Sequence, residues 1–299
     1  MDGRRRALLA AIAWTAALPR AAADERIGLK PIPSSGEPLP VVGIGTWQTF
    51  DVGAGAERAP LAQVLKAFVQ AGGSVVDSSP MYGAAESVVG ELITELGLRQ
   101  RLFLATKVWT RGREEGVRQM ESSLGRMHAG RMDLIQIHNL VDVATHTETL
   151  KRWKSEQRVR YIGITHYTAS AHAEVERWLG TGEYDFLQIN YSLGEREAER
   201  RLLPMAMEKK VAVIANRPFA EGALFRRVKG KPLPPWAAEL GVKTWAQYFL
   251  KWIVSHSAVT CAIPATANPR HVRDNVAAGL GALPDAAARR RMADYFDSL

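Results

Sequence analysis

The sequence predicts an α/β protein made of a single (β/α)8 TIM barrel, preceded by an N-terminal signal segment. Two observations support the barrel: eight short apolar runs recur along the chain, and stretches with helical spacing of apolar residues separate them. Such alternation packs as parallel strands joined by right-handed helical crossovers. Eight units in one domain over residues 24–299 favour a closed barrel. A doubly wound open sheet is the alternative.

Residues 1–23 have the features of an export signal. A basic start precedes an apolar run over 7–18, and three alanines at 21–23 form a small-residue cleavage site. The Arg5-Arg6 pair resembles the twin-arginine class of bacterial signal, which the export machinery reads and which is not an anchor. We therefore expect a periplasmic or otherwise exported protein with no stable membrane anchor after signal removal. An ordinary secretory signal is one alternative, and an uncleaved arm on a cytoplasmic protein is another.

The elements of the predicted barrel follow in order after residue 40, whereas the Pro-, Gly- and Ser-rich residues 24–40 are expected to lie over the surface. The predicted strands are 41–46, 74–77, 102–108, 132–138, 159–165, 185–191, 211–216 and 259–264. The predicted helices are 61–70, 87–96, 114–127, 147–156, 169–179, 195–209 and 244–255. The longest interruption, 218–243, follows the seventh strand on the face where barrel sites form, and loops of this length tend to be functional.

The composition argues against a nucleic-acid-binding protein, although the formal net charge is +8 from 39 basic and 31 acidic residues. Removing residues 1–23 takes away four arginines and one aspartate, which leaves 35 against 30, or +5. The remaining basic residues are scattered, which fits a local phosphate site better than a track for nucleic acid. The single Cys261 excludes internal disulfides and any multi-cysteine metal site.

Polar side chains end three successive predicted strands, at the rim where barrel enzymes place their chemistry. They are Asp77, with Tyr82 five residues beyond it, Lys107 and His138. A free phenol has a pKa of about 10, and a neighbouring lysine lowers that pKa while a carboxylate holds the lysine in place. A histidine can orient and polarise a carbonyl group. Each residue alone also has a structural explanation, such as a helix cap for Asp77, but the set favours a catalytic site.

Four motifs in the same order resemble the aldo-keto reductase superfamily: Gly43–Trp47, Asp77 with Tyr82-Gly83, Ala105–Trp109 and Asp133–His138. The resemblance implies a TIM barrel that binds NADPH without a Rossmann domain and reduces aldehydes and ketones by hydride transfer. It also implies that Tyr82 is the proton donor, that Lys107 and Asp77 tune it, and that His138 orients the carbonyl of a small-molecule substrate. The cofactor supplies the hydride, and the protein supplies positioning and electrostatics.

The resemblance further implies a set of cofactor-binding positions. They are Gly45, Thr46, Trp47, Thr165, His166, Gln188, Asn216, Arg217, Thr266, Arg270, His271 and Asn275. Four positions depart from the family: His166 replaces an asparagine, Asn216 a stacking aromatic residue, Ala265 a lysine, and His271 an arginine that grips the 2'-phosphate. Because Arg270 or Arg273 can compensate, we expect NADPH, with NADH as the alternative.

The resemblance places the substrate pocket at Trp47, Trp109, Asn139, Leu140 and the long loop after the seventh strand. Asn139-Leu140 stands where many relatives have tryptophan-proline, and little chain follows the last helix. Both features predict an open pocket and a weakly specified carbonyl substrate.

Two other functions are compatible with some of these residues. Asp77, His138 and His166 could ligate a metal that activates water for hydrolysis, although Tyr82 and Lys107 would then have no role. A nicotinamide-binding redox sensor or auxiliary subunit without turnover is the second alternative. The complete set of four residues favours an NAD(P)(H)-dependent oxidoreductase that acts on CH–OH donors or carbonyl acceptors, with no metal.

Overall fold

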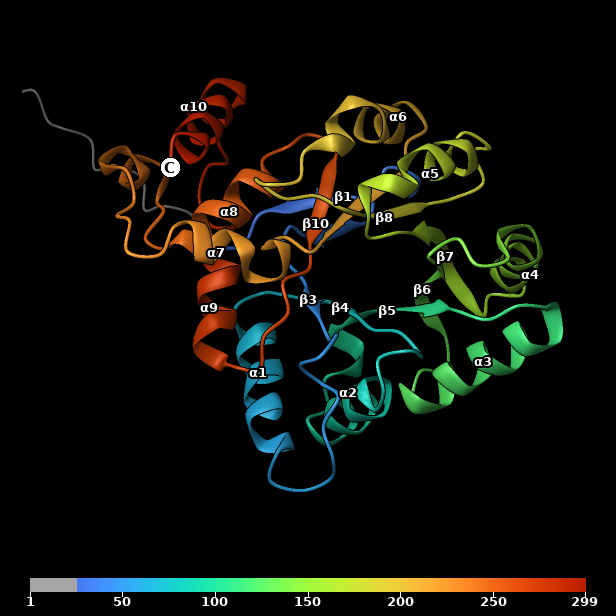
Figure 1. Ribbon diagram of the computed structural model, residues 1–299. Helices are drawn as coiled ribbons and strands as arrows, with labels where there is room; N and C mark the ends of the chain where they lie inside the picture. The colour runs from blue at the N-terminus through green and yellow to red at the C-terminus, as the bar shows by residue number, and fades with distance from the viewer. Residues whose placement is uncertain (1–25) are drawn as a thin grey trace, which may run out of the picture.

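The computed structural model describes residues 26–299 and shows eight parallel strands surrounded by helices (Figure 1). The strands are β3 (Ile44–Gly45), β4 (Val75–Asp77), β5 (Phe103–Val108), β6 (Met132–His138), β7 (Val159–Thr165), β8 (Phe186–Asn190), β9 (Ala212–Asn216) and β10 (Val259–Ala262). The ring closes because Gly43 N donates to Ala262 O at 2.8 Å and Ala262 N donates to Val41 O at 2.9 Å. The predicted TIM barrel is confirmed, and the open-sheet alternative is wrong.

Helices cover the outside of the barrel, and six of the seven predicted helices are present within a few residues. The seventh, predicted over 195–209, is divided into a 3-10 helix and a shorter α-helix. The covering helices are α1 (Arg58–Gln70), α2 (Ala85–Glu95), α3 (Arg113–Arg126), α4 (Val143–Ser155), α5 (His172–Leu179), α6 (Leu202–Glu208), α8 (Trp245–Val254), α9 (Pro269–Ala277) and α10 (Ala286–Asp297). Short 3-10 helices occur at Arg99–Arg101, Ala169–Ala171 and Glu197–Arg200. The larger hydrophobic cluster fills the space between helices and strands; Val64, Leu65 and Phe68 of α1 belong to it.

The barrel interior changes from apolar to polar along several strands. Side chains two residues apart point to the same face of a strand, so every inward row can be read from the sequence. In β5 the row is Phe103, Ala105 and Lys107, and in β6 it begins at Leu134 and ends at His138. The apolar members form a second, separate hydrophobic cluster. The interior is therefore filled with apolar side chains at the N-terminal ends of the strands, and it carries polar and ionisable side chains at their C-terminal ends.

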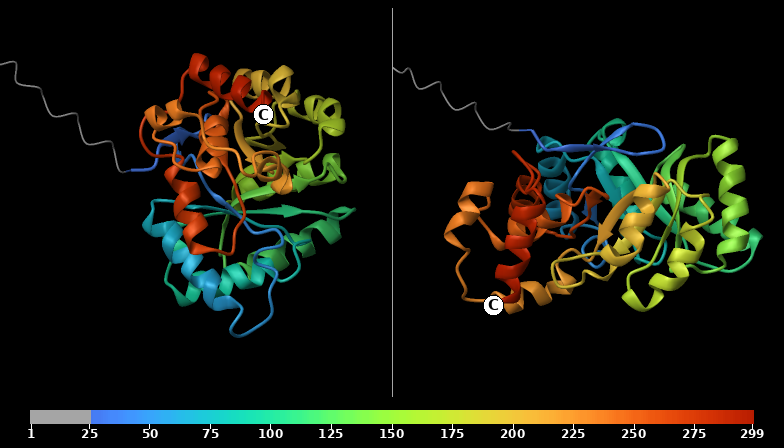
Figure 2. Two further views of the ribbon diagram at one scale, coloured as in Figure 1. Left: turned by 60° about the vertical axis from the view of Figure 1, so that its left-hand side comes forward. Right: turned by 90° about the horizontal axis from the view of Figure 1, so that it is seen from above.

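A β-hairpin closes the N-terminal end of the barrel and crosses it in Figure 2. Its strands, β1 (Leu29–Pro31) and β2 (Pro38–Pro40), pair antiparallel. Ile32 and Leu39 of this hairpin are 0% and 2% exposed and belong to the cluster inside the barrel. Lys30 Nζ donates to three backbone carbonyls around the start of β10, each at 2.7 Å. The segment does lie over the outside of the barrel, with residues 33–36 exposed, but the expectation missed that Ile32 and Leu39 complete the core.

The long segment 218–243 is more structured than the sequence suggested. It contains α7 (Ala223–Arg227) and 3-10 helices at Ala220–Gly222 and Pro235–Leu240.

Among residues 26–299, no helix has the length and apolar character needed to cross a bilayer. The predicted signal over 1–23 lies outside the described residues, so it remains a prediction.

Candidate active site

A buried ion pair forms the base of the site at the C-terminal ends of β4 and β5. Lys107 is fully buried, and its Nζ lies 2.6 Å from Asp77 Oδ2 and 2.7 Å from the carbonyl oxygen of Ser78. The other carboxylate oxygen of Asp77 accepts from the side-chain amides of Gln188 at 2.8 Å and Gln136 at 3.2 Å. Buried charges are tolerated only with partners of this kind. Both halves of the pair are therefore held in one geometry.

The charges around Lys107 decide its protonation. Burial acts to lower the pKa of Lys107, but the charge of Asp77, the proximity of Tyr82 and the hydrogen bond to Asp77 act in the opposite direction and outweigh it. The net effect raises the pKa of Lys107 above its ordinary value. Lys107 is therefore an ammonium ion at neutral pH.

Tyr82 lies over this ion pair, on the loop that follows β4. Lys107 Nζ is 5.0 Å from the centre of the Tyr82 ring. The loop is fixed by Asp51, whose carboxylate accepts from Ala84 N at 2.8 Å, and by Gly83, whose φ of 56° is a left-handed value that glycine adopts without strain. A side chain at position 83 would collide with the Asp51 carboxylate. The phenol position is thus set by its neighbours on both sides.

The pKa of Tyr82 is raised, and burial is the main cause. Lys107 acts to lower this pKa, as the sequence predicted, but its effect is smaller than that of burial. The phenol therefore keeps its proton near neutral pH, which is the state that a proton donor needs.

His138 ends β6 beside Tyr82 and is 6% exposed. The centres of the two rings are 5.9 Å apart with an interplanar angle of 86°, and the Trp109 ring lies 6.4 Å from that of His138. Burial, the charge of Lys107 and the proximity of His166 lower the pKa of His138 to about 2. The imidazole is neutral at physiological pH and acts as a hydrogen-bonding group, not as a cation.

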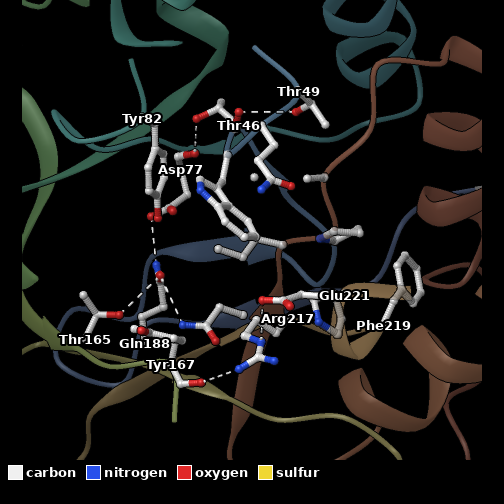
Figure 3. Close-up of a pocket in the computed structure, with 18 of the residues that line it drawn as sticks. Thr46, Thr49, Asp77, Tyr82, Thr165, Tyr167, Gln188, Arg217, Phe219 and Glu221 are labelled. Atoms are coloured by element: carbon white, nitrogen blue, oxygen red, sulfur yellow. Dashed lines mark hydrogen bonds and ion pairs between the residues drawn. The ribbon is translucent and has the colours of Figure 1, made fainter. Parts of the chain in front are cut away.

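A cavity of about 660 Å³ opens above these side chains. Figure 3 shows Tyr82 and Asp77 on one side of it and Arg217, Glu221 and Phe219 on the other. Lys107 lies beneath the cavity floor. The structure places many of the sequence-predicted residues on the cavity wall. They are Gly45, Thr46, Trp47, Asp77, Tyr82, His138, Asn139, Thr165, Gln188, Asn216 and Arg217.

One wall of the cavity carries polar groups with spare hydrogen-bonding capacity. Thr165 Oγ1 lies 3.4 Å from Gln188 Oε1, and Asn216 Nδ2 donates to the backbone carbonyl of His166 at 3.1 Å. Asn216 Oδ1 is buried and has no partner among the described residues. A buried acceptor without a donor is costly, so this atom fits an amide or hydroxyl donor from a bound ligand.

Arg217 directly follows β9 and projects into the cavity, where its guanidinium group already has hydrogen-bond and ion-pair partners. It donates to the backbone carbonyl of Tyr167 at 2.9 Å and lies 3.4 Å from Glu221 (Figure 3). Its guanidinium group also lies 3.7 Å from Glu195. A ligand phosphate would have to compete with these carboxylates for the guanidinium group.

The predicted residues that do not line the cavity include Trp109, Leu140 and His166. Trp109 stands beside His138 and is 42% exposed, whereas Leu140 packs into the larger hydrophobic cluster. The ring of His166 turns toward its own loop, where Nδ1 accepts from the backbone amides of Tyr167 at 3.0 Å and Thr168 at 3.3 Å.

The predicted adenosine-phosphate residues lie along α9 and on the segment just before it. Thr266 and Asn275 flank a small recess beside Gly43. Arg270 and His271 are exposed at the first turn of the helix. The N-terminus of α9 is capped by Asn268, which accepts from Arg270 N at 2.9 Å.

The metal-dependent alternative lacks a ligand set. Within the part of the chain that the structure describes, no three histidine, cysteine, aspartate or glutamate side chains are close enough to share a metal ion. Asp77 is occupied by Lys107 and two glutamines, and Nδ1 of His166 faces backbone amides.

Some residues of the site were not expected from the sequence. Gln136 could have been found, since it precedes His138 by two positions and so shares its inward face. Ser79 and Tyr167 lie on loops, where no periodicity shows which way a side chain points. Ser79 contacts His138, and Tyr167 lines the cavity and holds Arg217.

Fold and site together define a TIM-barrel protein whose rim holds a neutral phenol over a charged lysine, an arrangement suited to proton transfer at a carbonyl oxygen. Residues 41–290 match the model of the Aldo/keto reductase family. The chain belongs to this family, whose members are oxidoreductases.

Individual relatives agree with this assignment. The chain is 30% identical over 247 residues to Methylglyoxal reductase YeaE of Escherichia coli K12, covering 80% of this chain and 85% of that protein. It is 24% identical over 319 residues to the NADH-specific methylglyoxal reductase of the same organism, covering 86% and 95%. Among solved structures, an aldo-keto reductase from Klebsiella pneumoniae in complex with NADPH superimposes with a TM-score of 0.75, at 27% identity, covering 87% of this chain and 92% of that one.

Proposed function

We propose that the chain reduces aldehyde or ketone carbonyls to alcohols with a reduced nicotinamide cofactor, and that Tyr82 is the general acid. One observation carries the proposal: the phenol of Tyr82 lies over the buried Asp77–Lys107 pair at the floor of a large cavity. Family membership supports the reaction class.

The four residues have distinct roles in this proposal. The substrate carbonyl oxygen lies between Tyr82 and His138, and the neutral imidazole donates a hydrogen bond that polarises it. Tyr82 gives its proton to the oxygen as the alkoxide forms, and Lys107 stabilises the phenolate left behind. Asp77 keeps Lys107 in position and balances its charge. Solvent then returns a proton to Tyr82.

The residues around the cavity fit a nicotinamide cofactor. Asn216 Oδ1 offers a buried acceptor without a partner, which matches the amide group of a nicotinamide. Thr165 and Gln188 stand beside it, and Arg217 can take a phosphate in exchange for its present carboxylate partners. When bound, the cofactor supplies the hydride that the protein itself cannot. We propose NADPH, as in the Klebsiella pneumoniae structure, with NADH as the alternative because His271 and Ala265 replace basic residues.

The proposed substrates include small 2-oxoaldehydes. Two relatives from E. coli are methylglyoxal reductases. The cavity is open, and the side chains of Trp47 and Met81 at its wall are 42% and 38% exposed. An open pocket of this kind fits several small aldehydes and does not select one.

The test compares the wild-type chain from Asp24 onward with Tyr82→Phe, using methylglyoxal, an aromatic aldehyde, NADPH and NADH. We expect both proteins to bind the cofactor equally, as measured by protein fluorescence, and kcat to fall by about 100-fold to 10,000-fold in Tyr82→Phe. The matched control is Tyr184→Phe, which removes a buried hydroxyl bonded to Thr147 away from the cavity and should keep wild-type turnover.

Each result separates the alternatives. Turnover that survives in Tyr82→Phe would refute the assigned general acid. Tight cofactor binding without oxidation across the carbonyl panel would favour the redox sensor or auxiliary subunit. Absence of cofactor binding would mean that the substitutions at Asn216, Ala265 and His271 have removed the cofactor site.

We also propose that residues 1–23 export the folded protein, on the sequence pattern alone. Expression of the full chain in a bacterium should give a periplasmic product whose N-terminus is Asp24, measured by mass spectrometry. Replacing Arg5 and Arg6 by lysine should block export. A full-length product that stays in the cytoplasm would refute the proposal.

A further inference from the structure

Ser79 is a buried serine whose hydroxyl forms a hydrogen bond with one side chain among the described residues, that of His138. Its Oγ lies 3.1 Å from His138 Nδ1, and the serine is 0% exposed. The neighbouring Ser78 is equally buried but bonds to Thr46 Oγ1 instead, at 2.9 Å. Both serines follow β4 directly, so the same strand end that supplies Asp77 also supplies a contact to the histidine on β6.

The direction of the Ser79–His138 bond follows from the remaining partners. Met81 N lies 3.4 Å from Ser79 Oγ and donates to it, which uses an acceptor position of the hydroxyl. The second acceptor position of the hydroxyl could take a proton from Nδ1, but the hydroxyl proton would then have no acceptor, because His138 Nδ1 is the one acceptor within its reach among the described residues. Ser79 is also shielded from bulk water. The serine therefore donates and Nδ1 accepts, which requires the ring proton to be on Nε2.

The other nitrogen of the ring is the one available to a ligand. His138 lines the cavity, and Nε2 has no hydrogen-bond partner among residues 26–299. Because the pKa of His138 is about 2, the ring carries one proton at neutral pH, and its location decides whether Nε2 is a donor or an acceptor. Only a donor can polarise a carbonyl oxygen.

We propose that Ser79 is a positioning residue that holds His138 as the Nε2–H tautomer, so that the ring donates a hydrogen bond to the substrate carbonyl oxygen. The role in turnover rests on the proposed carbonyl reduction, whereas the tautomer is a property of the free protein. The two can therefore fail separately. Ser79 itself does not touch the substrate.

The experiment records long-range ¹H–¹⁵N spectra of protein labelled at its histidines, with the His138 signals assigned by their loss in His138→Gln. In the wild type we expect protonated Nε2 and an unprotonated Nδ1 whose ¹⁵N shift shows that it accepts a hydrogen bond. In Ser79→Ala the Nδ1 signal should move to the shift of a nitrogen without a donor. Ser78→Ala, which removes the adjacent buried hydroxyl, should leave both signals of His138 unchanged.

Kinetics of the same variants, after thermal unfolding has shown that they fold, give the second readout. Ser79→Ala should lower kcat about tenfold, the ratio expected from one ordinary hydrogen bond, while the Kd for NADPH stays within twofold. Ser79→Thr keeps the hydroxyl and should recover both the Nδ1 signal and most of kcat.

Three results would overturn the proposal. The first is a wild-type ring that carries its proton on Nδ1. The second is a Ser79→Ala variant with unchanged Nδ1 and unchanged kcat, and the third is a loss of kcat without any change at Nδ1, which would mean that the serine only packs. If no carbonyl is reduced but the spectra behave as described, the tautomer assignment stands and the proposed function fails.

Discussion

Replacing Asp77 by asparagine tests how much the buried ion pair contributes. The carboxylate accepts from three donors, namely Lys107 on one oxygen and Gln136 and Gln188 on the other. An amide accepts on one edge only, so its NH₂ group must face either the ammonium ion or the two glutamine amides. Lys107 would remain buried without a counter-charge. Removing one partner of such a pair costs about 3–5 kcal/mol of the free energy of unfolding.

The assay is urea unfolding followed by tryptophan fluorescence, together with thermal unfolding. A loss of about 4 kcal/mol corresponds to a Tm lower by roughly 8–16 °C for a domain of this size. The double variant Asp77→Asn, Lys107→Met removes the uncompensated charge and should be more stable than Asp77→Asn alone. In Asp77→Asn, burial becomes the dominant influence and lowers the pKa of Lys107. Part of Lys107 then loses its proton near neutral pH and kcat falls, so kcat should partly recover at lower pH, where Lys107 is protonated again. A loss below about 1 kcal/mol, or additive effects in the double variant, would refute this account.

Two further predictions concern stability. Ile32→Ala leaves a cavity at the end of the barrel that the hairpin closes, so the free energy of unfolding should fall by about 2–5 kcal/mol. The Kd for NADPH should not change, because the cofactor site is at the opposite end of the barrel. Weaker cofactor binding would contradict this separation of the packed N-terminal end from the site at the C-terminal end. His138 gives a pH dependence: its pKa is about 2 in the folded protein against about 6.5 in the unfolded chain, so below pH 6.5 the unfolded chain takes up a proton that the folded protein does not. Between pH 6.5 and 4.5 this group should lower the free energy of unfolding of the wild type by about 2 kcal/mol. The difference in free energy of unfolding between the wild type and His138→Gln, measured by urea unfolding, should change by the same amount. A difference that is constant with pH would count against a buried neutral histidine.

Much of the fold could be predicted because the barrel strands are strongly periodic. The predicted ranges 132–138 and 159–165 coincide with β6 and β7. The hairpin was not predicted, because β1 and β2 are three residues long and contain Pro31, Pro38 and Pro40, which normally argue against strands. Their place in the core depends on contacts with distant strands, and no local pattern encodes such contacts.

The site was predictable where a strand fixes the direction of a side chain. Asp77, Lys107 and His138 end adjacent strands and meet as expected. Loop residues were harder, since the ring of His166 turns away from the cavity to accept backbone amides one and two residues ahead. The pKa of Tyr82 depended on the balance between burial and Lys107, and the extent of burial cannot be read from the sequence.

The hairpin that closes the barrel also orders the events of folding. Lys30 reaches carbonyls that lie 224 to 229 residues later in the chain, and Gly28 N donates to Gly279 O at 2.8 Å. The first described segment is therefore synthesised long before these partners, and the hydrogen bonds of Lys30 and Gly28 cannot form until residues 254–279 have left the ribosome. Contacts of such sequence separation slow folding. The barrel is therefore completed only when the C-terminal part of the chain has been synthesised.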